Sequence, residues 1–556
     1  MARLDLPSLT QEFRSRLDQG DLAGAADRLA ALRTAYKADP QAFTRGDLAE
    51  LKRLSEGLRL RQALKDAFGY TTFRPGQEEV IQAVMAGRDA LAVMPTGAGK
   101  SLLYQLPARL LGGTTLVISP LIALMKDQVD ALEEAGLRAT FLNSSLDAET
   151  RRERLRGLHQ GTYEIVYAAP EGLDAYLADL LENVNLRLLA VDEAHCISHW
   201  GHDFRPSYRN LAGLKARFRE VPVLALTATA TGQVAEDIVT QLGMREPFQL
   251  RGSNYRSNLN IHALKKQKDG PGVRDSLLRL VEARPGQSGI IYGLSRKTVD
   301  STAAYLREHG IAARAYHAGL DAAERASVQE AFQRDDVDVV VATIAFGMGI
   351  DKGNVRYVIH RDMPKSLEGY AQEIGRAGRD GEPSDCILFY SWADVMALER
   401  FADDASGDQA DTQRRQVREM FRFAEATACR HQLLAHHFGE ELAACGDACD
   451  ICSGRDVLLE APRKIRKVKV KAGGVLPVAP VQTDEEGEGL FQRLRVLRKA
   501  LADERGVPPY VIFTDATLRA LATYRPTTEE HMLAMSGVGA KKLQQYGAAF
   551  LEVLRG

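Results

Sequence analysis

The sequence predicts an α/β protein with two consecutive parallel-sheet domains, followed by a helical metal-binding module and a small all-α domain. The first observation is a regular alternation of apolar runs and helical stretches between residues 58 and 400, which is typical of parallel sheets covered by helices on both faces. The second is a group of four cysteines between residues 429 and 452, and the third is purely helical periodicity in residues 489–556. At about 150 residues per domain, 556 residues leave room for three or four domains.

Composition excludes a membrane protein. No apolar stretch approaches the ~20 residues of a membrane span, and the first residues lack the apolar core of a signal peptide. We therefore expect a cytoplasmic protein. The net charge of −2, from 72 basic and 74 acidic residues, gives no indication for or against nucleic-acid binding. Only local clusters of charge can indicate such binding.

Residues 1–57 are expected to form a helical N-terminal extension. Apolar residues at Leu22, Ala25, Leu29 and Leu32 follow helical spacing, and Asp21 stands where a helix N-cap is expected. The segment has no group of catalytic side chains. It either packs on the next domain or docks a partner.

A phosphate-binding loop is predicted at residues 94–101, Met-Pro-Thr-Gly-Ala-Gly-Lys-Ser, between an apolar strand and a helical stretch. Gly97 and Gly99 allow a tight turn whose N–H groups can point at phosphate oxygens. Thr96 belongs to the same loop, and Met94 stands where the usual pattern has glycine. The alternative is a glycine-rich surface turn that binds no phosphate.

Two residues of this loop predict its ligands. Lys100 would reach the β- and γ-phosphates, and the Ser101 hydroxyl would bind Mg²⁺. Downstream, Asp192 and Glu193 follow the apolar run Leu188–Val191, so we expect them at the carboxyl end of a parallel strand. Asp192 is suited to hold Mg²⁺ through water, and Glu193 to orient and deprotonate the attacking water. The sequence thus predicts ATP and Mg²⁺ as ligands.

The second α/β region has no phosphate loop, which suggests a nucleotide bound in the cleft between the two. It carries Gln372-Glu373-Ile374-Gly375-Arg376-Ala377-Gly378-Arg379. Arg376 and Arg379 are about one helical turn apart and can face the same way. An arginine at the γ-phosphate stabilises the charge of the transition state, so Gln372, Arg376 and Arg379 are candidate catalytic residues. Surface ion pairing is the alternative.

An aromatic segment, Trp200-Gly201-His202-Asp203-Phe204-Arg205-Pro206, begins five residues after His195. Trp200 and Phe204 could stack on unpaired bases without sequence preference, with Arg205 beside them. A plain core role for both aromatic residues is the alternative.

A structural zinc site is predicted at Cys429, Cys445, Cys449 and Cys452. Without an export signal, such spacing favours metal over disulfides. Four thiolates give a closed tetrahedral Zn²⁺ site with no position for water. His431, His436 and His437 lie nearby, and one of them could replace a cysteine.

In the order of these motifs the chain resembles the RecQ family of DNA helicases, within helicase superfamily 2, over about residues 60–455 and 489–556. The resemblance implies RecA-like domains at 58–265 and 266–400, a zinc-binding domain at 401–455, a linker at 456–488 and an HRDC-like domain at 489–556. It implies an ATP-dependent helicase acting 3′ to 5′ in DNA repair and recombination, nucleoid-associated if bacterial. Single-stranded and partly duplex DNA would be its partners, possible further ones being a single-stranded-DNA-binding protein or a topoisomerase.

The resemblance also assigns roles to individual residues. Gln77 would hydrogen-bond adenine between Tyr70 and Arg74, and the aromatic segment would couple DNA binding to ATP hydrolysis. The residues implied in coupling or DNA contact are His195, Trp200, Phe204, Arg205, Thr227 and Thr229. In the last domain, Ser536–Lys542 looks like a helix-turn-helix element, where Lys541 and Lys542 would meet phosphates. A purely packed domain is the alternative there.

The chain departs from the family after the zinc module. Most members carry a winged-helix domain there, of roughly 100 residues, whereas only the 36 residues Gly454–Gly489 separate the last two modules. The alternative interpretation is therefore a translocase or annealing factor that unwinds poorly. A third interpretation is an ATP-controlled DNA-binding scaffold. Stacking and phosphate contacts alone do not exclude RNA.

The linker contains six cations at 463, 464, 466, 467, 469 and 471. Valines alternate with lysines from 467 to 471, so an extended segment would turn those lysines to one side. This basic stripe could replace the missing duplex contacts. A solvated tether is the alternative.

Overall fold

The computed structural model describes residues 6–120, 122–144, 146–172, 181, 183–198, 201, 203, 205–266, 272–347, 352–402, 408–461, 485–535 and 537–555. The chain folds into two compact units, Met1–Gly252 and Ser253–Gly556. None of the described helices is long and apolar enough to cross a membrane.

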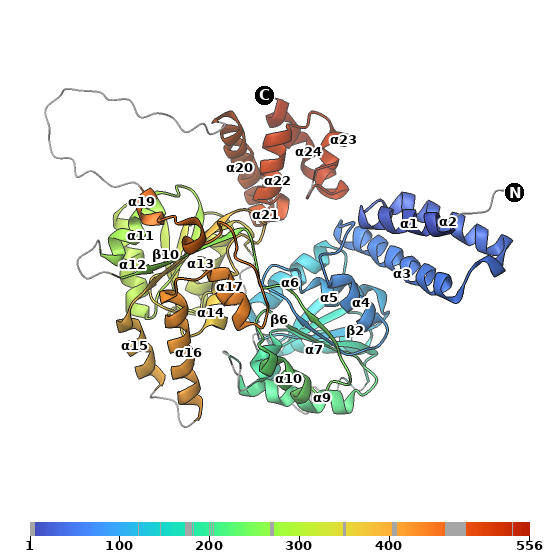
Figure 1. The fold of residues 1–556 in the computed structure, drawn as a ribbon, viewed down its shortest axis with the longest axis horizontal. Coiled ribbons are helices and arrows are strands. Elements are labelled where there is room, and N and C mark those ends of the chain that lie inside the picture. Colours follow the sequence, from blue (N-terminus) through green and yellow to red (C-terminus); the bar gives the residue numbers. More distant parts are fainter. Residues whose placement is uncertain are drawn as a thin grey trace. The chain divides into compact units, whose positions relative to one another are not determined.

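The first unit begins with three helices, α1 (Leu6–Asp18), α2 (Leu22–Ala38) and α3 (Arg45–Phe68), which pack around their own small core. Asp21 caps α2 as expected, because its side chain accepts a hydrogen bond from the Gly24 N–H at 2.9 Å. Helix α3 continues beyond residue 57, and its last turns bury Leu60 and Leu64 in the core of the α/β domain. The extension is therefore joined to that domain by a shared helix (Figure 1).

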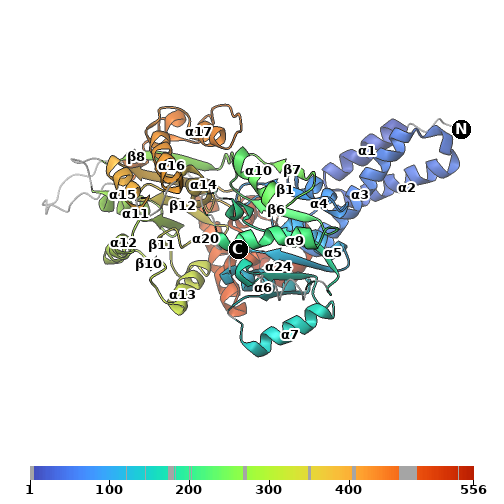
Figure 2. The same ribbon diagram turned by 90° about the horizontal axis from the view of Figure 1, so that it is seen from below.

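A seven-stranded parallel sheet forms the rest of the first unit, in the order β3-β4-β2-β5-β6-β1-β7. Successive strand residues enter two separate cores, Leu91 and Val93 on one face and Ala90 and Ala92 on the other, because helices cover both faces (Figures 1 and 2). The strands are β1 (Ala90–Val93), β2 (Thr114–Ile118), β3 (Ala139–Leu142), β4 (Ile165–Ala168), β5 (Leu186–Val191), β6 (Val223–Thr227) and β7 (Phe248–Arg251). The helices are α4 (Gln77–Met85), α5 (Leu102–Leu110), α6 (Ile122–Glu134), α7 (Ala148–His159), α9 (Ala212–Arg217) and α10 (Gly232–Gln241).

The second unit contains a six-stranded parallel sheet in the order β10-β11-β9-β12-β13-β8. Its strands are β8 (Leu259–Lys265), β9 (Ser288–Tyr292), β10 (Ala313–Tyr316), β11 (Val339–Ala342), β12 (Val355–His360) and β13 (Ser384–Tyr390). Its helices are α11 (Val273–Glu282), α12 (Arg296–Glu308), α13 (Ala322–Gln333) and α14 (Leu367–Ile374). The domain boundary expected at 265/266 is too late, because β8 pairs along its whole length with β13 and so belongs to the second sheet.

Helices complete the second unit, as predicted. The segment after the sheet forms α15 (Trp392–Ala402), α16 (Asp408–Glu425), α17 (Arg430–His437), α18 (Asp450–Ser453) and α19 (Val457–Glu460). The final all-α domain contains α20 (Glu485–Arg505), α21 (Pro509–Ile512), α22 (Asp515–Tyr524), α23 (Glu529–Leu533) and α24 (Ala540–Arg555) around its own core. The basic stripe at 463–471 lies outside the described residues.

Candidate active site and metal centre

The carboxyl ends of three neighbouring strands bring the predicted nucleotide residues together. Strand β6 lies between β5 and β1 and is parallel to both. The phosphate loop therefore follows β1 at the same edge where Asp192 follows β5 and Thr227 ends β6. The Met94 N–H donates to the Thr227 carbonyl at 2.9 Å, which ties the start of the loop to β6.

The loop at residues 94–101 adopts the tight shape that its glycines allow. Gly97 and Gly99 have φ angles of 83° and 81°, in the left-handed region that favours glycine. The Lys100 ammonium donates to the Met94 carbonyl at 3.1 Å and to the Pro95 carbonyl at 3.4 Å, so it reaches back across the loop. Thr96 lies within the turn, and Ser101 directly precedes α5, where its hydroxyl is positioned at the start of the helix.

The residues expected to read adenine are built onto the same loop. Gln77 is 2% exposed, and its amide nitrogen donates to the Ala98 and Gly99 carbonyls at 3.1 and 3.0 Å. A Cβ on Gly99 would stand 2.7 Å from that nitrogen, so only glycine leaves room for this contact. Arg74 donates from its side chain to Gly97, while Tyr70 is 61% exposed. Adenine contact by these residues stays a prediction. The hydrogen bonds of Gln77 and Arg74 to the loop are an additional role that local sequence did not indicate.

The acidic pair Asp192–Glu193 has a perturbed electrostatic environment. Burial, then the neighbouring Glu193, raises the pKa of Asp192 to about 7, although Lys100 opposes this shift. Oε2 of Glu193 is buried without a hydrogen-bond partner among the described residues and lies 3.4 Å from His195 Nδ1. Two half-buried carboxylates beside a phosphate loop are hard oxygen ligands, so the residues present fit Mg²⁺.

A chain of contacts connects the acidic pair to β6. His195 Nδ1 lies 2.9 Å from the Thr227 hydroxyl, and the Thr229 N–H donates to that same hydroxyl at 3.3 Å. The Tyr208 hydroxyl donates to the Asp192 carbonyl at 2.9 Å. Tyr208 was not singled out in the sequence, because a contact across 16 residues leaves no local pattern.

Part of the aromatic segment packs directly behind His195. The Arg205 N–H donates to the Cys196 carbonyl at 2.9 Å, and its guanidinium pairs with Asp203 at 3.1 Å. A Cβ on Gly201 would stand 2.5 Å from the His195 carbonyl oxygen, so this position requires glycine. Trp200 and Phe204 lie outside the described residues, and their contact with DNA stays a prediction.

The second unit holds its arginine segment by backbone contacts. Helix α14 carries Gln372 and ends just before Arg376, which is 6% exposed and donates to the Gly347 carbonyl. A Cβ on Gly347 would stand 2.5 Å from that guanidinium. Arg256, which sequence reasoning missed, donates to the Gly375 carbonyl at 3.0 Å. Arg376 is therefore engaged within its own unit, and the approach of Arg379 to a γ-phosphate stays a prediction.

The four predicted cysteines form one cluster. The sulfur atoms of Cys429, Cys445, Cys449 and Cys452 all lie within 4.8 Å of one another, and two of them accept backbone N–H groups at 3.4 Å. Four thiolates at this spacing fit tetrahedral Zn²⁺.

Two of the three nearby histidines, His431 and His437, have partners other than the cysteine cluster. His431 Nε2 lies 2.9 Å from the Leu259 carbonyl. His437 lies between Glu368 and Glu419, at 2.9 and 3.1 Å. Burial opposes the shift, but these two carboxylates raise the pKa of His437 to about 9. The geometry favours four cysteines over a histidine substitute.

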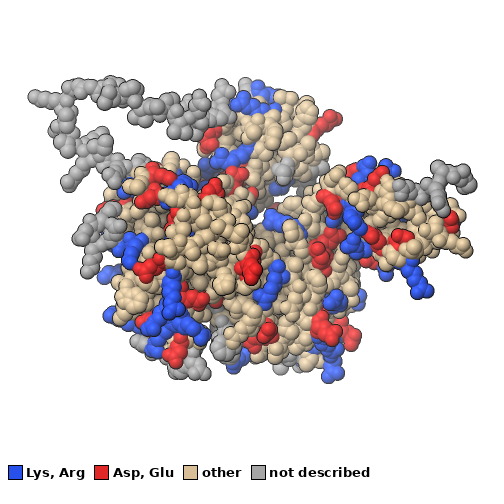
Figure 3. All heavy atoms as spheres, viewed as in Figure 1, with Lys and Arg blue, Asp and Glu red and all other residues tan. Residues whose placement is uncertain are grey.

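The candidate DNA-contact lysines of the final domain are only partly described. The Lys542 ammonium lies 6.0 Å from the centre of the Phe513 ring, and the side chain of Lys541 lies outside the described residues. On the face drawn in Figure 3, basic and acidic side chains are interspersed, so the described atoms there form no extended field of one sign.

Matches to family models follow the order of these sites. A DEAD/DEAH box helicase model matches residues 74–238, and a helicase conserved C-terminal domain model matches 272–381. A RecQ zinc-binding model matches residues 392–453, and an HRDC domain model matches 487–554. Two parallel-sheet units, the first with a phosphate loop and an Asp-Glu-Ala-His turn, define a helicase-type motor.

Full-length relatives make the assignment specific. An ATP-dependent DNA helicase RecQ of Pasteurella multocida is 37% identical, with 88% of this chain and 93% of the relative covered. One from Bacillus subtilis is 35% identical, with 89% and 98% covered. The chain belongs to the RecQ family of ATP-dependent DNA helicases. A solved structure, the DUF1998 helicase MrfA bound to DNA and AMPPNP, supports the fold alone, at a TM-score of 0.51 and 19% identity over 69% of this chain and 58% of that one.

Proposed function

We propose that this protein hydrolyses ATP to move along single-stranded DNA and to separate duplexes. The observation that carries the proposal is the gathering of Lys100, Asp192, Glu193 and Thr227 at one edge of the first sheet, in a chain whose full-length relatives are named ATP-dependent DNA helicases. A role in DNA repair and recombination and a cytoplasmic, nucleoid-associated location rest on the family resemblance.

Each residue at this edge has a role that its chemistry supports. Lys100 would neutralise the β- and γ-phosphates, while Ser101 and Asp192 would hold Mg²⁺. Glu193 would accept a proton from the attacking water, because its buried Oε2 has no hydrogen-bond donor among the residues that the structure describes. His195 and Thr227 would couple nucleotide binding at this site to the aromatic segment, through the contacts described above. Bound Mg²⁺ would supply positive charge that offsets the two carboxylates and the phosphates.

A specific observation favours a second candidate, a translocase or annealing factor that unwinds weakly. The zinc and HRDC models end at residue 453 and begin at residue 487. The Pasteurella alignment runs over 590 residues, although 88% of this chain is only about 490 residues. About 100 positions of that relative therefore have no counterpart here, which supports the expected loss of a winged-helix domain.

A strand-displacement assay distinguishes these two motors. The proposed helicase should separate a duplex with a 3′ single-stranded tail in the presence of ATP and Mg²⁺, and should do so poorly with a 5′ tail. Stimulation of ATP hydrolysis by the same tail without displacement would support the second candidate. No turnover with or without DNA would leave an ATP-controlled scaffold. Replacing the DNA tail with RNA tests the sugar preference, which stacking and phosphate contacts do not decide.

A further inference from the structure

The final helical domain lies against the amino ends of three strands of the second sheet. Strands β9, β11 and β13 begin at residues 288, 339 and 384. The loops in front of them contain Gly286, Asp335, Asp336 and Glu382, and basic side chains of α20 and α22 contact all three loops. These four residues, three of which are acidic, are called the acidic edge below.

The contacts at the acidic edge combine ion pairs with hydrogen bonds to backbone carbonyls. Lys499 Nζ lies 2.7 Å from the Asp336 carboxylate and donates to the Asp335 carbonyl at 3.2 Å. Arg519 Nε lies 3.4 Å from the Glu382 carboxylate. Arg495 adds a hydrogen bond at 3.2 Å to the Gly286 carbonyl. Cations of the final domain thus face anions of the sheet at more than one loop.

A buried charge network lies at the centre of this contact. Asp335 pairs with Lys352, whose side chain is 0% exposed, and its second oxygen lies 3.9 Å from Arg498, which is 1% exposed. Burial lowers the pKa of Lys352, and the Asp335 carboxylate opposes that shift. Arg498 is therefore an almost fully buried cation at the boundary between the final domain and Asp335 of the sheet.

The final domain presents its cations in a fixed arrangement. Arg495, Arg498 and Lys499 stand at i, i+3 and i+4 on α20, so they share one face of the helix. Arg498 is held from within its own domain by the Asp515 carboxylate at 2.8 Å and the Phe513 carbonyl at 2.7 Å. Side chains oriented before contact lose less entropy on docking.

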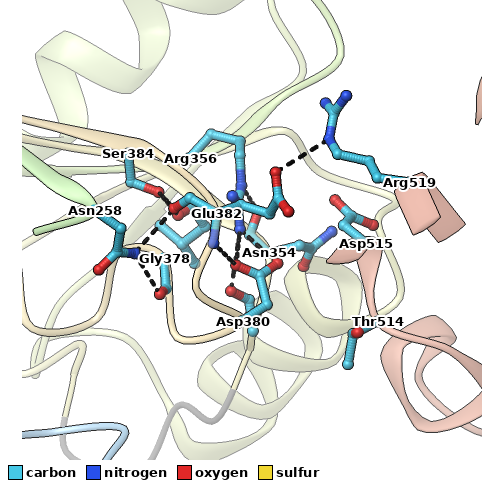
Figure 4. A network of polar contacts seen from close by, with 12 residues as sticks. Asn258, Asn354, Arg356, Gly378, Asp380, Glu382, Ser384, Thr514, Asp515 and Arg519 are labelled. Carbon is cyan, nitrogen blue, oxygen red and sulfur yellow. Dashed lines mark hydrogen bonds and ion pairs between the residues drawn. The ribbon is translucent and has the colours of Figure 1, made fainter. Parts of the chain in front are cut away.

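Figure 4 shows where this contact meets the arginine segment. Arg519 reaches Glu382, and the Glu382 N–H donates at 3.2 Å to Asp380, which pairs with Arg356 at 2.6 Å. Asp380 directly follows Arg379 in the chain. The docked domain is therefore connected through two residues to the turn that carries Arg379.

We propose that the acidic edge is a docking surface for the chain's own C-terminal domain, and that nucleic-acid phosphates compete with it for the same cations. Arginine and lysine that face carboxylates in the docked state are not available to phosphate oxygens. Released, Arg495, Lys499 and Arg519 offer a cationic face to DNA. Docking stands on the contacts alone, and only the identity of the competitor rests on the proposed function.

Charge exchange tests the docking in the full-length protein without DNA. Fluorophores on non-natural residues at exposed positions 297 and 524 report the separation by energy transfer. Lys499→Glu should lower transfer at low salt, Asp336→Lys should do the same, and the two changes together should restore it. Arg493→Glu, an equal charge change at an exposed position of α20, should leave transfer unchanged. Failure of the double exchange to restore transfer, or equal loss with Arg493→Glu, would overturn docking through these pairs.

Substitutions that neutralise carboxylates of the acidic edge test the competition with nucleic acid, since they leave the cations of the final domain intact. Exposed ion pairs contribute about 0.2–1 kcal/mol each, so Asp336→Asn with Glu382→Gln should tighten binding of a single-stranded oligonucleotide without ATP about two- to thirtyfold. Saturating oligonucleotide should lower energy transfer in the unmodified protein. Unchanged transfer at saturation would overturn the competition. No DNA binding at all would instead overturn the proposed function, and the charge exchange would still decide the docking.

Discussion

Lys100 and Glu193 serve the same reaction in different ways, and substitution separates them. Lys100→Ala should reduce ATP turnover at least about 100-fold, because phosphate charge loses its main cation. Glu193→Gln should reduce turnover by about 10²- to 10⁴-fold through loss of the base, yet still bind ATP. Turnover and binding of a fluorescent ATP analogue measure both effects. Turnover at the unmodified rate in either variant would contradict the assignment.

Asp192 should make Mg²⁺ binding depend on pH near neutrality. Its pKa of about 7 means that the carboxyl is protonated below that value in the metal-free protein, and Mg²⁺ must displace the proton. The Mg²⁺ affinity in the presence of an ATP analogue should therefore fall as pH drops from 8 to 6, approaching tenfold per unit below pH 7.

The control for this titration is Asp192→Asn, which measures the protonation of the nucleotide itself. Titration calorimetry at pH 6, 7 and 8 provides the comparison. If the two proteins show the same pH dependence, Asp192 does not titrate in this range.

Trp200 tests whether the aromatic segment couples DNA to the active site. Trp200→Ala should keep basal ATP hydrolysis but weaken its stimulation by single-stranded DNA, since base stacking contributes about 1–3 kcal/mol per base. The measurement is turnover against oligonucleotide concentration. Undiminished stimulation would make Trp200 a core residue.

At the scale of elements, the cysteine cluster organises α17 and α18 around the edge of the second sheet. Arg430 pairs with Asp450 at 3.0 Å, and Asp450 also accepts the Ala263 N–H of β8 at 3.1 Å. Zinc bound by the four cysteines would therefore contribute to the folding energy of this region. Cys449→Ser should lose the single bound Zn²⁺ and lower the melting temperature.

Elemental analysis and calorimetry check this expectation, with Cys386→Ser as the matched control. Cys386 is a buried thiol of β13 and does not belong to the cluster of four cysteines. Its variant should therefore keep one zinc per chain. A metal-free protein with unchanged melting would refute the zinc site.

Elements with strong apolar runs were predictable, and those with mixed residues were not. Residues 165–168 and 339–342 are apolar throughout and form strands β4 and β11, with every residue buried. Strand β7 (Phe248–Arg251) was missed because an edge strand exposes every second residue and its sequence alternates. The late domain boundary has a similar cause, since β8 mixes polar and apolar residues and is recognised only by its pairing with β13.

Within the candidate site, too, some residues could be predicted from the sequence and others could not. Motif residues such as Lys100 and Asp192 could be found because their spacing follows local chain geometry. Supporting contacts such as Arg256 with Gly375, or Arg498 with Asp335, join positions more than a hundred residues apart, and no local pattern encodes them. The sequence thus predicts which residues act, and the fold supplies what holds them.

At the scale of the whole molecule, the basic stripe at 463–471 tests how the chain manages without a winged helix. Replacing its six cations with Gln should weaken duplex binding and flatten its salt dependence, because each phosphate contact contributes about −0.9 to the slope of log K against log salt. Basal ATP turnover should persist, since these residues are remote in sequence from the nucleotide motifs. Superimposable salt plots would show a simple tether.

Strand β8 is the last strand of its sheet, and the cysteine cluster lies directly on its free side. The Ile261 N–H donates to the Ala448 carbonyl at 3.0 Å, and Ile261 forms a parallel bridge with Cys449. An uncovered strand edge is a template for pairing with another molecule. Stripping zinc from the four cysteines should therefore expose a site for intermolecular β-pairing at this edge.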